Sequence, residues 1–457
     1  MSKRKLFGTD GIRGEANQYP MTAEVAMRLG RALGLRLAAE RRHRPRVLVG
    51  KDTRLSGYLF ETSLCAGLVS AGADVYLVGP LPTPGIAFLT TGMRCDAGVV
   101  ISASHNPYQD NGIKLFARDG YKLPDEEEAA LEAMLFEDLD PSSLPRGAAI
   151  GRAHRVDDAA GRYAVYCKTA FPRDLTLEGV KIVVDCANGA AYRVAPEVFT
   201  DLGAEVVAVG CRPDGTNINK RTGALHPEYA GAMVRRTGAH LGVTLDGDAD
   251  RCILCDERGE IVDGDQILAV LARDLKAQDK LPGDRVVATV MSNVGLERSL
   301  AEVGVQLDRV GVGDRYVVER MRASGAALGG EQSGHVILSS HATTGDGIVT
   351  ALAVLGIMVR RQRPLSALAS CMTRYPQVLR NVRVREKREL AAMPEVSAVV
   401  DRVESELGPA GRVLLRYSGT ELLARVMVEG PDEAQIAAAA LEIADTLLTA
   451  LGAAEEP

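Results

Sequence analysis

The sequence predicts an α/β protein in which three repeated α/β domains with mixed sheets, followed by a smaller C-terminal α+β domain, surround a central cleft. Two observations predict this architecture. Three stretches of the chain repeat one order of strands and helix-like segments, and the last part of the chain follows a different order. The length of 457 residues is enough for three or four domains.

The composition is that of an ordinary globular protein, with 46% apolar and 25% charged residues and no Trp. A net charge of −6 without a basic block argues against nucleic acid or an anionic membrane as a partner. The basic start lacks the apolar run of a secretory signal, and no stretch reads as a membrane span. Eight scattered Cys fit reduced thiols, so we expect a cytoplasmic protein. Cys252 and Cys255 form a CxxC that reads as a buried strand; a redox or zinc site is the alternative.

Each repeat opens with a short apolar strand that runs into a polar loop, at residues 46–52, 181–189 and 285–293. A helix-like stretch and a second strand that starts with Gly follow, at 72–79, 203–210 and 304–311. In the first two repeats another helical stretch precedes the third strand. The third strands run into unusual loops within 97–107, 241–251 and 328–335. Because ligands bind beyond the carboxyl ends of such strands, one loop per domain is expected to face a shared cleft. Three unrelated α/β domains are the alternative.

The tail reads as a small α+β domain. A strand is expected over 380–386, a helix near 394–407, two strands over 413–417 and 422–428, and a last helix with apolar residues on one face. A linker region is expected over 141–160. The predicted domains are 1–155, 156–256, 257–370 and 371–457.

Ser104 is the candidate nucleophile of the first loop. It stands at the end of a strand, in Ser-Ala-Ser-His-Asn-Pro, with Lys114 nearby in the sequence. Small and turn-forming residues leave room there for a phosphate or a sugar. A polar turn with a helix cap explains this motif equally well.

Asp246, Asp248 and Asp250 are the candidate metal ligands of the second loop. Carboxylates on alternate residues repel one another, so a fold that gathers them needs a cation, and hard oxygen ligands select Mg²⁺ or Ca²⁺. A calcium EF-hand is disfavoured because Arg251 stands where its turn needs Gly. Mg²⁺ keeps positions open for a phosphate oxygen, and Arg251 can neutralise the same phosphate. A solvated acidic turn is the alternative.

The third loop carries a carboxylate, a hydroxyl and an imidazole on alternate positions: Glu331, Ser333 and His335. The carboxylate and the hydroxyl suit paired sugar hydroxyls. The alternative is a cap or turn in which His335 is hydrogen-bonded within the protein. Taken without the other loops, this motif favours that alternative.

The fourth loop is the turn Ser418-Gly419-Thr420, flanked by Arg416 and Arg425. Its backbone amides and the two arginines could hold a phosphate. A plain hairpin turn is the alternative. The four loops together lack the nucleotide site of a kinase, and a simple phosphatase would not need a second phosphate anchor.

With these four loops in order, the chain resembles the α-D-phosphohexomutase superfamily over nearly its whole length. The segments 7–14, 50–54, 313–316 and 343–347 are similar to the branch that acts on hexosamine phosphates. Ala249 stands where that branch often has Gly.

The resemblance implies a role for each loop and domain. Ser104 would carry a phosphoryl group, with Ser102 the less favoured carrier. Mg²⁺ would be held by the three aspartates and the Ser104 phosphate, in a metal-binding second domain. The remaining implied site residues are Arg13, Lys114 and His335 for catalysis; Arg251, Glu331 and Ser333 for substrate binding; and Arg416, Ser418, Gly419, Thr420 and Arg425 for the phosphate that is not transferred.

The implied activity is that of an intramolecular phosphotransferase. It would interconvert glucosamine 6-phosphate and glucosamine 1-phosphate through phospho-Ser104 and a 1,6-bisphosphate. A phosphomannomutase or phosphoglucomutase of the same superfamily is the alternative, and a non-catalytic sugar-phosphate sensor or a Mg²⁺ phosphatase is less favoured. The expected partner is a small hexosamine phosphate, and the expected assembly a monomer or homodimer.

Overall fold

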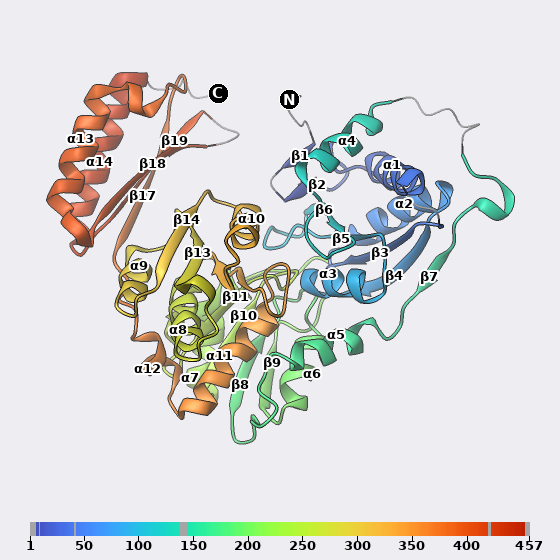
Figure 1. The fold of residues 1–457 in the computed structure, drawn as a ribbon, viewed down its shortest axis with the longest axis horizontal. Coiled ribbons are helices and arrows are strands. Elements are labelled where there is room, and N and C mark those ends of the chain that lie inside the picture. Colours follow the sequence, from blue (N-terminus) through green and yellow to red (C-terminus); the bar gives the residue numbers. More distant parts are fainter. Residues whose placement is uncertain (1–5, 9, 41–42, 138–143, 419–421, 453–457) are drawn as a thin grey trace. The chain divides into compact units, whose positions relative to one another are not determined.

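The computed structural model describes residues 6–8, 10–40, 43–137, 144–418 and 422–452. It divides into two compact units. The first unit comprises residues 1–289 and 308–370, and the second comprises 290–307 and 371–457. Each unit is described by itself (Figure 1).

The first sheet of the first unit has seven strands. They are β1 (Phe7–Gly8), β2 (Gly11–Glu15), β3 (Arg46–Lys51), β4 (Asp74–Pro80), β5 (Ala97–Ile101), β6 (Asp110–Ala117) and β7 (Ala153–Arg155). Their spatial order is β1-β2-β6-β5-β3-β4-β7, in which β5, β3, β4 and β7 run parallel and the other pairs are antiparallel. β7 lies in the region where we expected only a linker.

Helices cover both faces of this sheet (Figure 1). They are α1 (Ala23–Glu40), α2 (Gly57–Ser70), α3 (Thr83–Gly92) and α4 (Asp125–Leu135). Apolar residues of α1, α2 and α4 form one core with Val47, Val49 and Val99 of the central strands. The central strands are apolar on both faces because helices cover both, as is typical of parallel sheets.

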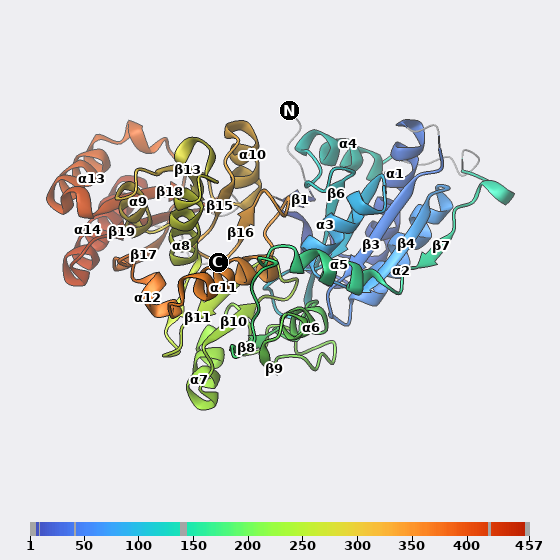
Figure 2. The ribbon, with the colours of Figure 1, turned by 60° about the horizontal axis from the view of Figure 1, so that its bottom comes forward.

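The second sheet has five strands: β8 (Lys181–Asp185), β9 (Glu205–Val209), β10 (Leu241–Leu245), β11 (Cys252–Cys255) and β12 (Ile261–Val262). Their order is β12-β11-β10-β8-β9, with β10, β8 and β9 parallel. The helices of this region are α5 (Ala159–Lys168), α6 (Val194–Asp201) and α7 (Pro227–Thr237), after the short η2 (Gly147–Ala149). Figure 2 shows α5 alongside α3 and α6. The CxxC forms the buried strand β11, as predicted, and all eight cysteines are free.

The third sheet has the order β14-β13-β15-β16, in the strands β13 (Arg285–Thr289), β14 (Gln306–Val310), β15 (Leu328–Gly330) and β16 (Val336–Leu338). The helices here are α8 (Gly264–Ala277), α10 (Asp314–Ser324), α11 (Gly347–Arg361) and α12 (Leu365–Ala369), with the short η3 (Pro282–Asp284). α10 lies between β14 and β15 in the chain, so the third repeat also has a helix at the position where we expected one only in the first two. Thus all three repeats share one plan, and their mixed sheets confirm the predicted fold class.

The second unit is built on an antiparallel sheet of order β17-β19-β18. Its elements are α9 (Val294–Ala301), β17 (Gln377–Arg383), η4 (Leu390–Ala392), α13 (Pro394–Leu407), η5 (Gly408–Ala410), β18 (Arg412–Tyr417), β19 (Leu423–Glu429) and α14 (Glu433–Leu451). β17 begins and ends three residues before the predicted strand because its pairing with β19 extends back to Gln377. Segment 290–307 joins this unit through bonds such as Arg412 to the Ser292 carbonyl at 3.0 Å. The predicted domain boundaries stay a prediction.

Among the described residues, α14 alone is long and apolar enough to cross a membrane by length and composition. The criterion is weak, because core helices also meet it. The predicted apolar face of α14, with Ile436, Ala440, Ile443 and Leu447, is buried in the core of the second unit.

Candidate active site

The loop after β5 presents Ser104 to a cavity of about 380 Å³ in the first unit. The Ser104 hydroxyl is buried and donates a hydrogen bond to Asp246 Oδ2 at 2.5 Å, and His105 Nδ1 lies 3.3 Å from Ser104 Oγ. Ser104 has a φ of +50°, in the left-handed region that non-glycine residues rarely adopt. The Ser102 hydroxyl donates instead to Asp52 at 2.6 Å and accepts from the Ser104 amide at 2.9 Å. The geometry therefore favours Ser104 over Ser102 as the group that meets a ligand.

Residues from three loops line this cavity. The loop after β5 contributes Ser104 and His105, the loop after β10 contributes Asp250 and Arg251, and the loop after β15 contributes Glu331 and His335. The N-terminal segment, with Asp10 and Arg13, and the residues around Asp314 complete the lining. The prediction that the three loops share one cavity is thus confirmed within the first unit.

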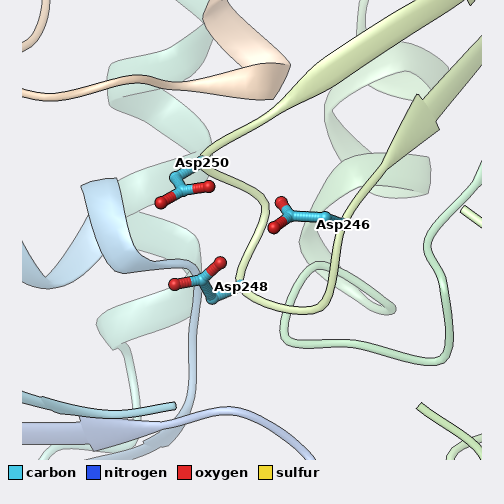
Figure 3. Close-up of side chains that lie close together, drawn as sticks. All are labelled: Asp246, Asp248 and Asp250. Atoms are coloured by element: carbon cyan, nitrogen blue, oxygen red, sulfur yellow. The ribbon is translucent and has the colours of Figure 1, made fainter. Parts of the chain in front are cut away.

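Asp246, Asp248 and Asp250 occupy the turn between the antiparallel strands β10 and β11. Figure 3 shows their carboxylates projecting toward one another from this single loop. All three are buried, and one oxygen of each lies within 4.8 Å of the others. The turn needs a left-handed residue at Ala249, whose φ is +57°. Glycine adopts this conformation more easily, which explains physically why the related branch often has Gly at this position.

Asp246 and Asp248 accept hydrogen bonds from neighbouring groups, and Asp246 does so with both of its oxygens. Asp246 Oδ1 accepts from the Arg251 amide at 3.1 Å, and Asp248 Oδ2 accepts from the Thr83 hydroxyl at 2.6 Å. Asp248 Oδ1 and Asp250 Oδ1 are buried and have no hydrogen-bond partner among the residues that the structure describes. Burial, together with the carboxylates of Asp250 and Asp248, raises the pKa of Asp246 well above its ordinary value. Orphaned oxygens and crowded negative charge both fit a divalent cation with hard oxygen ligands.

Lys114 of β6 is the buried cation nearest to this trio. Its Nζ lies 2.9 Å from Asp248 Oδ2, 3.6 Å from Asp250 Oδ2 and 3.1 Å from Asp10 Oδ2. Burial would lower the pKa of Lys114, but the three carboxylates outweigh burial and raise it above its ordinary value. The ammonium therefore stays charged. Because Asp10 shares it, Lys114 does not by itself balance the charge of the aspartate trio.

Two arginines, Arg13 and Arg251, contribute positive charge to the lining of the cavity. Arg13 pairs with Asp10, and Arg251 Nε lies 3.9 Å from Asp250 Oδ1. Within the described part of the chain, the Nε atoms of Arg13 and Arg251 are buried without a hydrogen-bond partner. Burial and the charges of Arg251 and Arg13 lower the pKa of His105 to about 4, so this imidazole is neutral at pH 7. Buried guanidinium donors without acceptors are suited to an oxyanion ligand such as phosphate.

The third loop brings Glu331 and His335 to the cavity, while Ser333 is exposed and its hydroxyl lies 3.4 Å from Glu331 Oε2. His335 Nε2 accepts from the Gly345 amide at 3.0 Å, and Nδ1 lies 3.7 Å from Asp250 Oδ2. Burial lowers the pKa of His335, but Asp250 outweighs burial and raises it to about 8. The bond from the Gly345 amide requires a lone pair on Nε2 and so favours a ring with its proton on Nδ1, whereas the nearby carboxylate of Asp250 favours the protonated ring.

The fourth loop belongs to the second unit. Arg416 of β18 lies opposite Arg425 of β19 in the sheet. Like charges in this position repel, and burial together with Arg425 lowers the pKa of Arg416. Among the described residues, Arg425 Nε is buried without a hydrogen-bond partner, and Lys387 Nζ donates to the Ser418 carbonyl at 2.5 Å. An anion here would relieve the repulsion. Gly419 and Thr420 lie outside the described residues.

The sequence did not identify several residues that shape the site. Asp10 and Asp314 pair with Lys122, Thr83 holds Asp248, and Arg54 is buried against the Ser104 loop. Thr83 reads as an ordinary helix start and Lys122 as an ordinary turn residue. Asp10, Arg54 and Asp314 lie within segments 7–14, 50–54 and 313–316, whose similarity to the related branch was the available signal.

Four family models match the chain in order. They are described as phosphoglucomutase/phosphomannomutase alpha/beta/alpha domain I over residues 4–141, domain II over 163–259, domain III over 263–375, and the C-terminal domain over 379–446. Together they cover most of the chain.

Single proteins agree with the family models. A phosphoglucosamine mutase from Myxococcus xanthus is 58% identical over 450 residues, which is 98% of each chain. The crystal structure of a phosphoglucomutase/phosphomannomutase family protein from Burkholderia thailandensis covers 97% of both chains with 26% identity and a TM-score of 0.78. An N-acetylphosphoglucosamine mutase from Aspergillus fumigatus, solved with GlcNAc-6P and magnesium, covers 98% of this chain and 96% of its own at 18% identity and a TM-score of 0.66, which shows the fold alone. With four matching domains and a relative of 58% identity along nearly the whole chain, this protein belongs to the phosphoglucosamine mutases, a family of isomerases.

Proposed function

We propose that the chain interconverts glucosamine 6-phosphate and glucosamine 1-phosphate through a phosphoryl group carried on Ser104. One observation carries the proposal: Ser104 lines the cavity with its hydroxyl 2.5 Å from Asp246 Oδ2, and Arg13 and Arg251, which can bind a phosphoryl group, line the same cavity. The names of the close relatives support the choice of sugar.

In this proposal Mg²⁺ would be held by Asp246, Asp248, Asp250 and the phosphate on Ser104. The fit rests on the buried carboxylate oxygens without partners and on the charge crowded around Asp246. When bound, the ion would neutralise charge on the transferred phosphoryl group.

In this proposal, side chains of the cavity would bind the substrate and handle the proton. Glucosamine 6-phosphate would bind with its 1-hydroxyl near phospho-Ser104. The bond between phosphorus and Ser104 Oγ breaks, a bond from phosphorus to the sugar oxygen forms, and the hydroxyl proton moves to a nearby base. Arg13, Lys114 and His335 are the proposed groups for moving or orienting this proton. Arg251 would neutralise the phosphate, and Glu331 and Ser333 would hold sugar hydroxyls.

The 1,6-bisphosphate must then turn end for end, so that its 6-phosphate returns to Ser104 and glucosamine 1-phosphate leaves. The phosphate that is not being transferred would bind Arg416, Ser418, Gly419, Thr420 and Arg425. The opposed arginines in β18 and β19 support this assignment. Cytoplasmic location, a small sugar phosphate as the main partner, and a monomer or homodimer are proposed with it.

The second candidate is a phosphomannomutase or phosphoglucomutase, which the description of the matching family models favours. Initial rates with the 6-phosphates of glucosamine, glucose and mannose, measured side by side with Mg²⁺, separate the two. We expect glucosamine phosphate to turn over fastest. Faster turnover of glucose or mannose phosphate would overturn the choice of sugar, and steady release of inorganic phosphate in place of isomerised product would indicate a phosphatase.

The phosphoserine is tested separately by the intact mass of the purified protein. We expect the added mass of one phosphoryl group in the wild type and in Ser102→Ala, and its loss in Ser104→Ala. An added mass that survives in Ser104→Ala would place the phosphate elsewhere.

A further inference from the structure

Arg54 lies against the Ser104 loop and uses every hydrogen-bond donor that a guanidinium group has. Its side chain is fully buried. Nε donates to Asp52 Oδ2 at 2.8 Å. The two terminal nitrogens donate to four backbone carbonyls, those of Ser104 at 2.9 Å, Asn106 at 2.8 Å, Asp110 at 2.9 Å and Pro107. A guanidinium carries five N–H donors, so none is left over.

Three of these carbonyls, those of Ser104, Asn106 and Pro107, belong to the segment that connects β5 to β6, and the fourth belongs to Asp110, the first residue of β6. One rigid, planar group therefore fixes the spacing of the whole loop that carries Ser104. A lysine at this position would offer three donors from a single atom and could not hold four separated carbonyls.

Asn219 binds the same loop from the region of the second sheet. Its side-chain amide donates to the carbonyls of Ser104 at 2.8 Å and Asn106 at 3.1 Å. Its own backbone is held by a bond from its amide to the Ala187 carbonyl at 2.8 Å. The Ser104 carbonyl thus receives one donor from Arg54 and a second from Asn219.

The amide of Ser104 is held by the same network. It donates to Ser102 Oγ at 2.9 Å, and Ser102 donates to Asp52 Oδ2, the oxygen that also accepts from Arg54 Nε. Both polar groups of the Ser104 backbone are therefore fixed. A serine at a φ of +50° is strained, and such residues persist where their surroundings determine them fully.

We propose that Arg54 and Asn219 are positioning residues that hold the backbone of Ser104 so that its Oγ keeps one geometry toward the Asp246 loop. The proposal rests on phosphoryl transfer at Ser104. That reaction uses Ser104 as donor and later as acceptor, so Oγ must return to the same place after each transfer. Neither Arg54 nor Asn219 lines the described cavity, so both act through Ser104.

This role predicts a particular kinetic signature. Substrate binding depends on groups of the cavity, whereas transfer depends on the exact placement of Oγ. A displacement of about 1 Å can lower a rate about 100-fold. Loosening the loop should therefore lower kcat and leave KM nearly unchanged.

The test uses the full chain with the variants Arg54→Lys and Asn219→Gly. Glycine suits Asn219 because its φ is +58°, so the variant removes the amide without straining the backbone. Asn188→Gly is the matched control: Asn188 has a φ of +51° in the same region, and among the described residues its side chain bonds to backbone atoms of Asn217 and Arg212 and not to the Ser104 loop. The readouts are kcat and KM with glucosamine 6-phosphate, and the rate at which glucosamine 1,6-bisphosphate phosphorylates Ser104.

We expect both variants to lower kcat about 10- to 100-fold with KM within about threefold, to slow phosphorylation of Ser104 by the same factor, and Asn188→Gly to stay near the wild type. A kcat of Asn219→Gly within about twofold of the wild type, or a rise in KM alone, overturns the proposal. If Arg54→Lys does not fold, Asn219→Gly decides the outcome. A wild type without phosphoserine or mutase activity would refute the proposed function itself.

Discussion

Thr83 gives the sharpest test of the metal site, because its hydroxyl touches a proposed ligand without reaching the cavity. Thr83 starts α3, and its Oγ1 donates to Asp248 Oδ2 at 2.6 Å with both side chains buried. Its backbone amide also donates to the Asp248 carbonyl at 2.9 Å. Thr83→Val keeps the shape and the backbone bond and removes only the hydroxyl donor.

The structure sets the size of the effect. Hydrogen bonds to charged groups contribute about 1.5–3 kcal/mol, which is about 10- to 150-fold in affinity. Lys114 still donates to the same Asp248 oxygen at 2.9 Å in the variant, so the lower part of this range applies. We expect Mg²⁺ affinity to fall about 10- to 30-fold, in line with other partners that orient metal ligands.

Mg²⁺ affinity is measured by titrating the metal-free protein calorimetrically and by the Mg²⁺ dependence of the mutase rate. Thr83→Ser keeps a hydroxyl and should bind Mg²⁺ like the wild type. Thr90→Val is the matched control, because Thr90 is a buried threonine of the same helix whose hydroxyl donates to the Ile86 carbonyl. If Thr83→Val binds Mg²⁺ within about twofold of Thr90→Val, the role assigned to this hydrogen bond is wrong.

The remaining predictions concern the metal loop and the pH dependence of stability. A Cβ on Gly247 would come within 2.5 Å of the Ser104 carbonyl oxygen, so Gly247→Ala should displace the Ser104 loop and lower kcat about 100-fold. Gly161→Ala is the control, because a Cβ there meets open space, and its kcat should stay near that of the wild type. A kcat of Gly247→Ala equal to that of Gly161→Ala would contradict the prediction. Burial raises the pKa of Asp346 from 3.8 to about 6, so the folded state binds this proton more tightly and the free energy of unfolding falls as pH rises through that window. Asp346→Asn should remove this pH-dependent loss of stability, which amounts to about 3 kcal/mol. The melting temperature of the variant minus that of the wild type should therefore increase between about pH 4 and pH 7. A difference in melting temperature that stays constant over this range would refute the prediction.

Much of the fold could be predicted because the three repeats restate one pattern of strands, helices and loops. The helix α10 was missed in the third repeat because polar and charged residues interrupt its apolar spacing: only Arg315, Val317 and Met321 are buried along it. Residues 290–307 group with the C-terminal part through contacts such as the hydrogen bond from the Ser299 hydroxyl to the Cys371 carbonyl at 2.7 Å. The local sequence pattern does not predict contacts of this kind.

The site residues likewise include some that the local sequence reveals and some that it does not. Ser104 and the three aspartates stand in unusual loops directly after strands, so their chemistry could be recognised locally. The structural roles of Arg54 and Asn219 could not, because they depend on backbone carbonyls at least 50 and more than 100 residues away in the chain; for Arg54 the sequence offered only the similarity of segment 50–54 to the related branch. A buried arginine is recognised only when its acceptors are in place.

The central claim is that the phosphoryl group passes from Ser104 to the sugar and that another returns. The most direct measurement is a single turnover in which protein labelled with ³²P on Ser104 is mixed with unlabelled glucosamine 6-phosphate. Transfer through the 1,6-bisphosphate predicts that the label leaves Ser104 and is found at carbon 1 of glucosamine 1-phosphate. Label that remains on the protein while product forms, or that leaves as inorganic phosphate, would contradict the mechanism.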